Sequence, residues 1–192
     1  MIDVEIRGPL SKKDYERVRK LLENAGADVR SEKRISLDYS NDPRVHVELQ
    51  YKNGTPRIVI ERGVVGAREE IVTRLEADQL DQALSLMAFF GYTKGVVVAE
   101  DVLHASYGGA DFMLLDSGDE SVYHYEASIS ATDPTLAREG KEKLEKLARN
   151  LRLPIWNDKE MYAFTRKLTE TVNYMYDYDT DGAGHFKDKF GI

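Results

Sequence analysis

The first strand-like stretch of the chain alternates charged and apolar residues. Residues 2–7 read Ile-Asp-Val-Glu-Ile-Arg, so an extended chain places Asp3, Glu5 and Arg7 on one face and the apolar residues on the other. Two carboxylates and a guanidinium then lie within about 14 Å of chain. Such a face lies in water or lines a wet polar cavity, and this pattern alone leaves both interpretations open.

A second group of acids lies near the C-terminus. Residues 177–182 have the Asp-x-Asp-x-Asp-Gly spacing of a calcium loop, in which oxygens surround a hard cation and glycine makes the turn. Asp188 takes the twelfth position, where such loops prefer Glu. One interpretation is Ca²⁺ binding at Asp177, Asp179 and Asp181, and the other is a polar, partly disordered tail.

Other familiar catalytic spacings are absent from the sequence. The four histidines lack the HExxH spacing of zinc enzymes, and there is no serine elbow or glycine-rich phosphate loop. A phosphate site in this chain would therefore be built from side chains.

Hydrophobic periodicity predicts the elements that must position these residues. A period near 3.6 predicts helices at 11–25, 77–90, 134–151 and 159–176. A period of two predicts strands at 2–7, 33–39, 44–51, 57–61, 68–75, 96–107, 112–116 and 122–130. Asn53-Gly54 is a strong two-residue hairpin turn.

Composition restricts the class of protein. The chain has 192 residues, 42% of them hydrophobic and 32% charged, which is typical of one globular domain. Its net charge of −7 argues against nucleic acid as a partner, and no apolar run is long enough to span a membrane. Without cysteine or a signal-like N-terminus, we expect a cytoplasmic protein.

The strand pattern predicts an α+β fold, an antiparallel eight-stranded β-barrel, or tunnel, with a polar interior and amphipathic helices covering its outside. The alternative is an open antiparallel sheet with one solvated face. In a barrel, charged residues from strands distant in sequence approach one another. We expect the following residues to point inward: Glu5, Arg7, Arg57, Glu70, Asp116 and Glu126. The barrel and its helices would span residues 1–176, followed by an acidic, glycine-containing tail at 177–192.

Three features, in this order along the chain, resemble one known family. They are the acid-x-Glu-x-base strand at residues 3–7, the Asp38-Tyr39 pair, and Asp116 followed ten residues later by Glu126. In this order they resemble the CYTH superfamily of triphosphate tunnel enzymes, which includes class IV adenylate cyclases and thiamine triphosphatases. The resemblance extends to about residue 176 and implies the tunnel fold.

The resemblance also implies site residues and a cofactor. Catalytic residues and ligands of Mg²⁺ or Mn²⁺ would be Glu5, Asp116 and Glu126. Phosphate would be bound by Arg7, Arg44, Arg57 and Arg68. The implied partner is a small-molecule triphosphate or another anion, and the implied assembly is a monomer or homodimer.

The chain departs from the family where basic residues are expected. Glu48, Glu61 and Glu100 stand in regions that carry Lys or Arg in the family, and acids there would oppose a polyanion. Two functions are therefore open. One is a metal-dependent enzyme that hydrolyses inorganic or organic triphosphate or cyclises a nucleotide, and the other is a degenerate CYTH-like anion- or ligand-binding protein without turnover.

Overall fold

The computed structural model describes residues 2–39, 45–64, 67–118 and 122–192. Its strands are β1 (Ile2–Leu10), β2 (Val29–Asp38), β3 (Val45–Lys52), β4 (Thr55–Val64), β5 (Ala67–Arg74), β6 (Lys94–Tyr107), β7 (Ala110–Asp116), β8 (Tyr123–Ala131) and β9 (Tyr174–Asp177). Its helices are α1 (Lys12–Asn24), α2 (Leu80–Phe89), α3 (Pro134–Leu151), α4 (Asp158–Thr171), α5 (Tyr178–Asp181) and α6 (His185–Phe190), and a 3₁₀ turn, η1 (Ala77–Gln79), precedes α2.

The strands form a mostly antiparallel sheet, which confirms the predicted α+β class. Within the described residues the order is β1-β8-β7-β6-β2-β3-β4-β5, with β9 paired to β6. No strand pairing in this part of the chain joins β5 back to β1, so the sheet is not closed into a barrel and that prediction was wrong. Alternation fixes the two faces of each strand, but closure depends on the pairing of two strands that are distant in sequence.

The chain divides into two compact units. Unit 1 comprises Met1–Glu32, Val65–Arg68 and Glu100–Val172, and unit 2 comprises Lys33–Val64, Glu69–Ala99 and Asn173–Ile192. β2 and β6 each contribute one end to unit 1 and the other end to unit 2.

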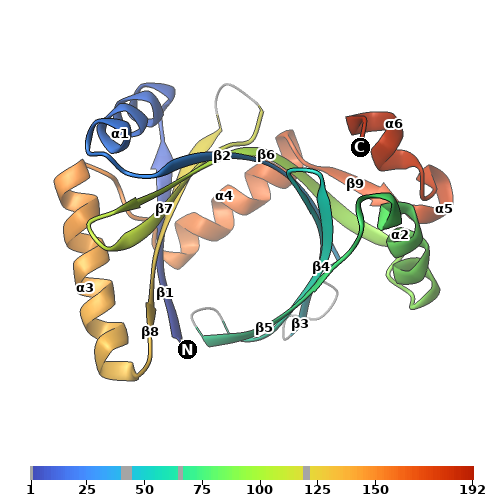
Figure 1. Ribbon diagram of the computed structural model, residues 1–192, viewed down its shortest axis with the longest axis horizontal. Coiled ribbons are helices and arrows are strands. Elements are labelled where there is room, and N and C mark those ends of the chain that lie inside the picture. Colours follow the sequence, from blue (N-terminus) through green and yellow to red (C-terminus); the bar gives the residue numbers. More distant parts are fainter. Residues whose placement is uncertain (1, 40–44, 65–66, 119–121) are drawn as a thin grey trace. The chain divides into compact units, whose positions relative to one another are not determined.

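In unit 1, helices α1 and α3 cover the apolar face of the strands, and α3 runs along β1 and β8 (Figure 1). As predicted, the apolar residues of the alternating strands pack beneath these helices, with Ile6 and Tyr125 buried and Val4 and Ile129 beside them. Because the period of a strand is two, the opposite face of β1 and β8 carries the polar residues.

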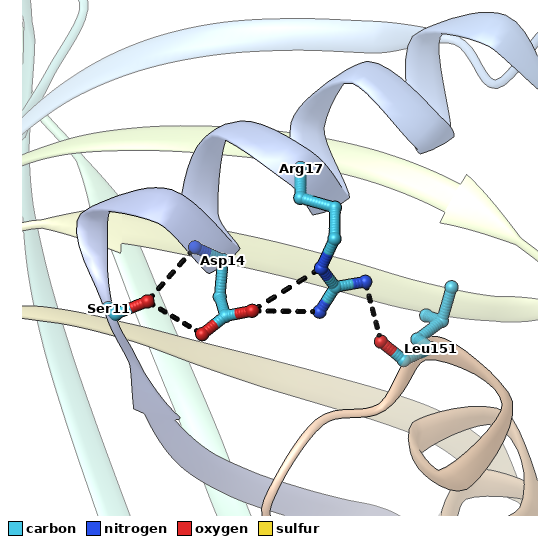
Figure 2. A network of polar contacts seen from close by, with 4 residues as sticks. All are labelled: Ser11, Asp14, Arg17 and Leu151. Atoms are coloured by element: carbon cyan, nitrogen blue, oxygen red, sulfur yellow. Dashed lines mark hydrogen bonds and ion pairs between the residues drawn. The ribbon is translucent and has the colours of Figure 1, made fainter.

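The start of α1 is tied to the end of α3 by a polar network (Figure 2). Ser11 is the N-cap of α1, and its Oγ accepts a hydrogen bond from the Asp14 backbone N–H at 3.1 Å. Asp14 also accepts from the Arg17 guanidinium, which donates to the Leu151 carbonyl at 2.9 Å. The cap thus fixes both the first turn of α1 and its contact with α3.

Unit 2 has its own apolar core. The buried face of α2 packs with the apolar residues of β2 and β3 and with Tyr176 and Phe186 from the C-terminal segment. The predicted boundary at residue 176 falls inside β9, and the residues after it form α5 and α6. The predicted helix at 159–176 ends at Thr171, because Tyr174–Asp177 pair with β6 instead.

The segment that follows α3 crosses over β1. The Trp156 backbone N–H donates to the Arg7 carbonyl at 2.8 Å, and the Tyr125 hydroxyl donates to the Pro154 carbonyl at 2.9 Å. A Cβ placed on Gly8 would lie 1.9 Å from that Pro154 oxygen. Glycine is therefore required at position 8 for the two backbones to approach.

Candidate functional site

The strand pairing of β1 with β8 brings Glu5, Arg7 and Glu126 together in unit 1. Arg7 stands directly opposite Glu126, and Glu5 stands opposite Ser128, so all four side chains share one face. The Arg7 Nε donates to Glu5 Oε1 and lies 3.3 Å from Glu126 Oε1. A single guanidinium thus lies between two carboxylates from neighbouring strands.

The carboxylates of this group are partly buried. The Glu126 side chain is 13% exposed, and those of Glu5 and Arg7 are 34% and 41% exposed. Burial raises the pKa of Glu5; Arg7 opposes this shift, while Glu126 and Asp3 add to it. Asp3 continues the same polar face and accepts a hydrogen bond from Ser130 Oγ at 2.7 Å.

The structure does not bring Asp116 to this group. In the register of β7 with β8, Asp116 pairs with Tyr123, whereas Met113 stands opposite Glu126. Positions 113 and 116 differ by an odd number of residues, so Asp116 lies on the other face, with Phe112 and Leu114 of the core. The expectation that Asp116 and Glu126 share a face was therefore wrong.

Electrostatics agree with this placement of Asp116. The pKa of Tyr15, which is buried in α1, is raised first by burial and then by the nearby Asp116 carboxylate. α1 covers the apolar face of unit 1, so Asp116 belongs to the side on which the helices lie.

Aromatic residues border the acid group at one end. His124 is two residues before Glu126 on the same face, and its ring lies 5.1 Å from that of Phe164 and 6.2 Å from that of Trp156, between centroids. The Trp156 and Phe164 rings are 4.4 Å apart. Trp156 and Phe164, the second of which is on α4, therefore place apolar rings against His124 on this face.

A second polar group, which we name the His46 cluster, lies in unit 2 and comprises Asp38, His46, Glu48, Gln50 and Arg57. The His46 Nδ1 is 3.4 Å from Asp38 Oδ1, and its Nε2 is 3.6 Å from Glu48 Oε2. The Gln50 Nε2 donates to Glu48 Oε2 at 2.5 Å, and the Arg57 Nε donates to Gln50 Oε1 at 2.7 Å. Three neighbouring strands contribute to this chain of contacts.

The cluster shifts the pKa values of its central members in opposite directions. The contact with Glu48 raises the pKa of His46; burial opposes this shift, while Asp38 and Glu61 add to it. Burial raises the pKa of Glu48, but hydrogen bonds from His46, Ser36 and Gln50 outweigh it and leave the pKa below its usual value. The ionised pair of His46 and Glu48 is therefore favoured.

Arg57 was predicted from the sequence as a phosphate ligand, and Asp38 and Glu48 were also noted. Their meeting with His46 and Gln50 was not predicted, although the hairpin turn was available as a signal. A two-residue turn at Asn53-Gly54 pairs Lys52 with Thr55, and counting outward places Gln50 opposite Arg57. The same count places His46 opposite Glu61. The spacing of His46 matches no metal motif, and two of the acids near it, Asp38 and Glu61, come from the neighbouring strands β2 and β4.

Three other residues predicted to line the site belong to neither of these two polar groups. Arg44 lies outside the residues that the structure describes, and so does the side chain of Arg68. Glu70 is in β5 with an exposed side chain. Their roles stay predictions.

The aspartates of the predicted calcium loop make contacts of their own. Asp177 caps α5 by accepting from the Asp179 backbone N–H, and Asp181 accepts from the Asp177 backbone N–H at 2.8 Å. Lys94 Nζ lies 2.7 Å from Asp177 Oδ2. An ammonium thus already neutralises the first acid of the loop, and calcium binding stays a prediction.

The residues predicted to hold Mg²⁺ or Mn²⁺ do not fit a divalent ion as they are arranged. Such ions need several oxygen ligands around one point. Glu5 and Glu126 direct their Oε1 atoms toward Arg7, and Asp116 is on the opposite face. Across the described ranges, no three His, Asp or Glu side chains gather closely enough to hold a metal ion.

None of the helices in the described ranges has the length and apolar character needed to cross a membrane.

Comparison with known proteins finds likeness in structure only. No protein-family model matches the sequence, and no curated protein matches it. PH1012 from Pyrococcus horikoshii OT3 superposes with a TM-score of 0.65 at 15% identity, over 80% of this chain and 94% of that one. A candidate adenylate cyclase from Vibrio parahaemolyticus gives 0.60 at 16% identity, over 85% and 98%.

A third solved structure has a triphosphatase activity in its own description. The candidate adenylyl cyclase HpAC1 from Hippeastrum, described as having a dominant triphosphatase activity, gives a TM-score of 0.56 at 10% identity, over 86% of this chain and 95% of that one. At these identities the likeness concerns the fold alone. The chain shares its fold with these solved structures, two of which are named as candidate adenylate or adenylyl cyclases, and the resemblance seen in the sequence agrees with this fold.

Proposed function

We propose that this protein uses a CYTH-type fold to bind a small anion and does not turn over triphosphates with a divalent metal. The observation that carries the proposal is the position of Arg7. Its guanidinium lies between Glu5 and Glu126, the two acids that share a face, while the third predicted ligand, Asp116, is on the other face.

Arg57 supports the choice of an anion as ligand. Its Nε donates to Gln50, and in the described part of the chain it makes no ion pair with a carboxylate. A guanidinium held through Nε presents its two terminal nitrogens as a fork, which matches a carboxylate, phosphate or sulfate. Asp38, Glu48 and Glu61 on the same face would repel a long polyanion, so a small anion suits this place better than a triphosphate.

The first experiment measures turnover. Purified protein is incubated with Mg²⁺ or Mn²⁺ and a panel of inorganic and organic triphosphates, and phosphate release is compared with that of the Glu126→Gln variant. We expect the two proteins to release phosphate equally slowly. A cyclic-nucleotide assay with ATP covers the cyclase reaction, and there too we expect no product above the variant.

The second experiment measures binding. Titration calorimetry with sulfate or pyrophosphate should show binding that Arg57→Gln weakens about tenfold or more, because a charge-assisted hydrogen bond contributes roughly 1.5–3 kcal/mol. Arg62→Gln is the matched control, since Arg62 is exposed and lies on the opposite face of the same strand. Equal affinity in both variants would show that Arg57 does not bind the anion.

The second candidate function is the metal-dependent triphosphate-processing enzyme. It is favoured by the meeting of Glu5 and Glu126 on one face and by the fold shared with the Hippeastrum protein. It requires Arg7 to leave both carboxylates. Phosphate release that depends on metal and is lost in Glu126→Gln would establish this function and contradict our proposal.

A further inference from the structure

The polar face of unit 2 carries nearly balanced charge. The described residues of β2, β3 and β4 in this unit place three carboxylates and three permanent cations on that face, by register and alternation. The carboxylates are Asp38, Glu48 and Glu61, and the cations are Arg34, Lys52 and Arg57. His46 lies among them, so its proton decides whether the residues of these three strands sum to zero or to +1 on this face.

The geometry around His46 suits the protonated ring. Its Nδ1 faces Asp38 at 3.4 Å and its Nε2 faces Glu48 at 3.6 Å, with Glu61 directly across in β4. A neutral imidazole has one N–H and one lone pair, and would direct the lone pair at one of these carboxylates. An imidazolium presents N–H groups to both.

The contacts continue from His46 to Arg57. Glu48 Oε2 faces His46 and also accepts from Gln50 Nε2, while Gln50 Oε1 accepts from Arg57 Nε. Gln50 is 8% exposed, and only one orientation of its amide serves both partners. Gln50 is therefore a positioning residue, which links the charge of Glu48 to the orientation of the Arg57 fork.

We propose that the proton on His46 controls anion binding at Arg57. With His46 protonated, its positive charge offsets one of the two carboxylates that it faces, and the charged residues counted on β2, β3 and β4 sum to +1. When the proton leaves, Glu48 loses its counter-charge, the face becomes neutral, and the same anion binds more weakly. The inference rests on the proposed function. It adds that the affinity of the Arg57 site for its anion falls as pH rises.

Sulfate is a suitable probe, because its own charge does not change between mildly acidic and mildly alkaline solution. We expect the wild-type protein to bind sulfate about fivefold more tightly near pH 6 than near pH 8, on either side of the ordinary histidine pKa. His46→Gln should bind weakly and equally at both. His104→Gln is the matched control, since it removes a histidine from unit 1 and should keep the wild-type ratio.

A second measurement uses only the wild-type protein, so it does not depend on whether a variant folds. Coupling between two sites is reciprocal, so saturating sulfate must raise the pKa of His46, as followed by NMR of its ring protons in the wild-type protein. An unchanged pKa, or a pH ratio that survives in His46→Gln, would overturn the inference and leave the proposed function in place. Absence of sulfate binding at both pH values would overturn the proposed function itself, and this inference with it.

Discussion

At two places in this protein, a single cationic side chain lies between two carboxylates, at least one of which comes from a neighbouring strand. Arg7 pairs with Glu5 and Glu126 in unit 1, and His46 pairs with Asp38 and Glu48 in unit 2. In both places one cation lies between two acids. Removal of the cation leaves two carboxylates facing each other in partly buried surroundings, which is costly.

His46 should make stability depend on pH. Its pKa in the folded state is raised by Glu48, so its stabilising contribution is complete below the unfolded value near 6.5 and is lost as pH rises through the folded pKa. We expect the wild-type protein to lose stability relative to His46→Gln as pH rises from about 6 to about 8.5. Urea midpoints at both pH values measure the difference, and a constant difference would contradict the assignment.

Ser11 should contribute to stability through the cap of α1 shown in Figure 2. It accepts from the Asp14 N–H, and its hydroxyl also donates to Asp14 Oδ2 at 2.6 Å. Ser11→Ala should therefore lower the free energy of unfolding by about 1 kcal/mol. Ser11→Thr keeps a capping hydroxyl and should lose much less, so equal losses in the two variants would exclude the cap as the cause.

At the scale of elements, α3 packs on β1 and β8 through a face that contains a glycine. Gly140 is buried, and a Cβ placed there would lie 3.5 Å from Ile129 and 3.9 Å from Val4, which is ordinary contact. Gly8 in β1 differs, since a Cβ there would lie 1.9 Å from a carbonyl oxygen. The backbone contact therefore requires glycine at position 8, whereas position 140 has room for a methyl group.

Alanine at these two positions should have opposite effects. Gly140→Ala should stabilise by about 0.5–1 kcal/mol, because alanine restricts the unfolded chain and has room in the native state. Gly8→Ala should destabilise by roughly 1–3 kcal/mol, because the crossing segment must move. Chemical unfolding of both variants measures the two signs, and a destabilised Gly140→Ala would show that α3 cannot accept the added methyl.

Much of this element-level organisation could be predicted from the sequence. Alternation assigned Ile6, Tyr125, Glu5 and Glu126 to their faces, because each strand repeats every two residues. The face of Asp116 could not be predicted, because it depends on the register of β7 with β8, and a slip of one residue reverses every side chain. β9 was missed because Tyr174–Asp177 is short and its partner strand is distant in sequence.

At the scale of the whole molecule, two units share two strands. β2 and β6 pass from one unit into the other, so the units have no separate chain boundaries at these points. A strand that loses its partners in one unit also loses support in the other. We therefore expect the two units to unfold together.

The single tryptophan provides a test of this coupling. Trp156 belongs to unit 1, and Leu84 is fully buried in the core of unit 2. Leu84→Ala should cost 2–5 kcal/mol, typical of a cavity in a core, and should lower the midpoint of the Trp156 fluorescence transition. Leu86→Ala is the matched control, since Leu86 is exposed on the same helix. An unchanged Trp156 transition in Leu84→Ala would show that the units unfold separately.

The crossing of the segment after α3 over β1 has a consequence for behaviour at high concentration. Within the described residues β1 ends the strand order, and a free strand edge is a template on which another copy of the chain can add. Here the Trp156 N–H already occupies the Arg7 carbonyl, and Pro9 offers no N–H of its own. The crossing segment and Pro9 thus block the Arg7–Pro9 end of this edge, which should hinder edge-to-edge association there.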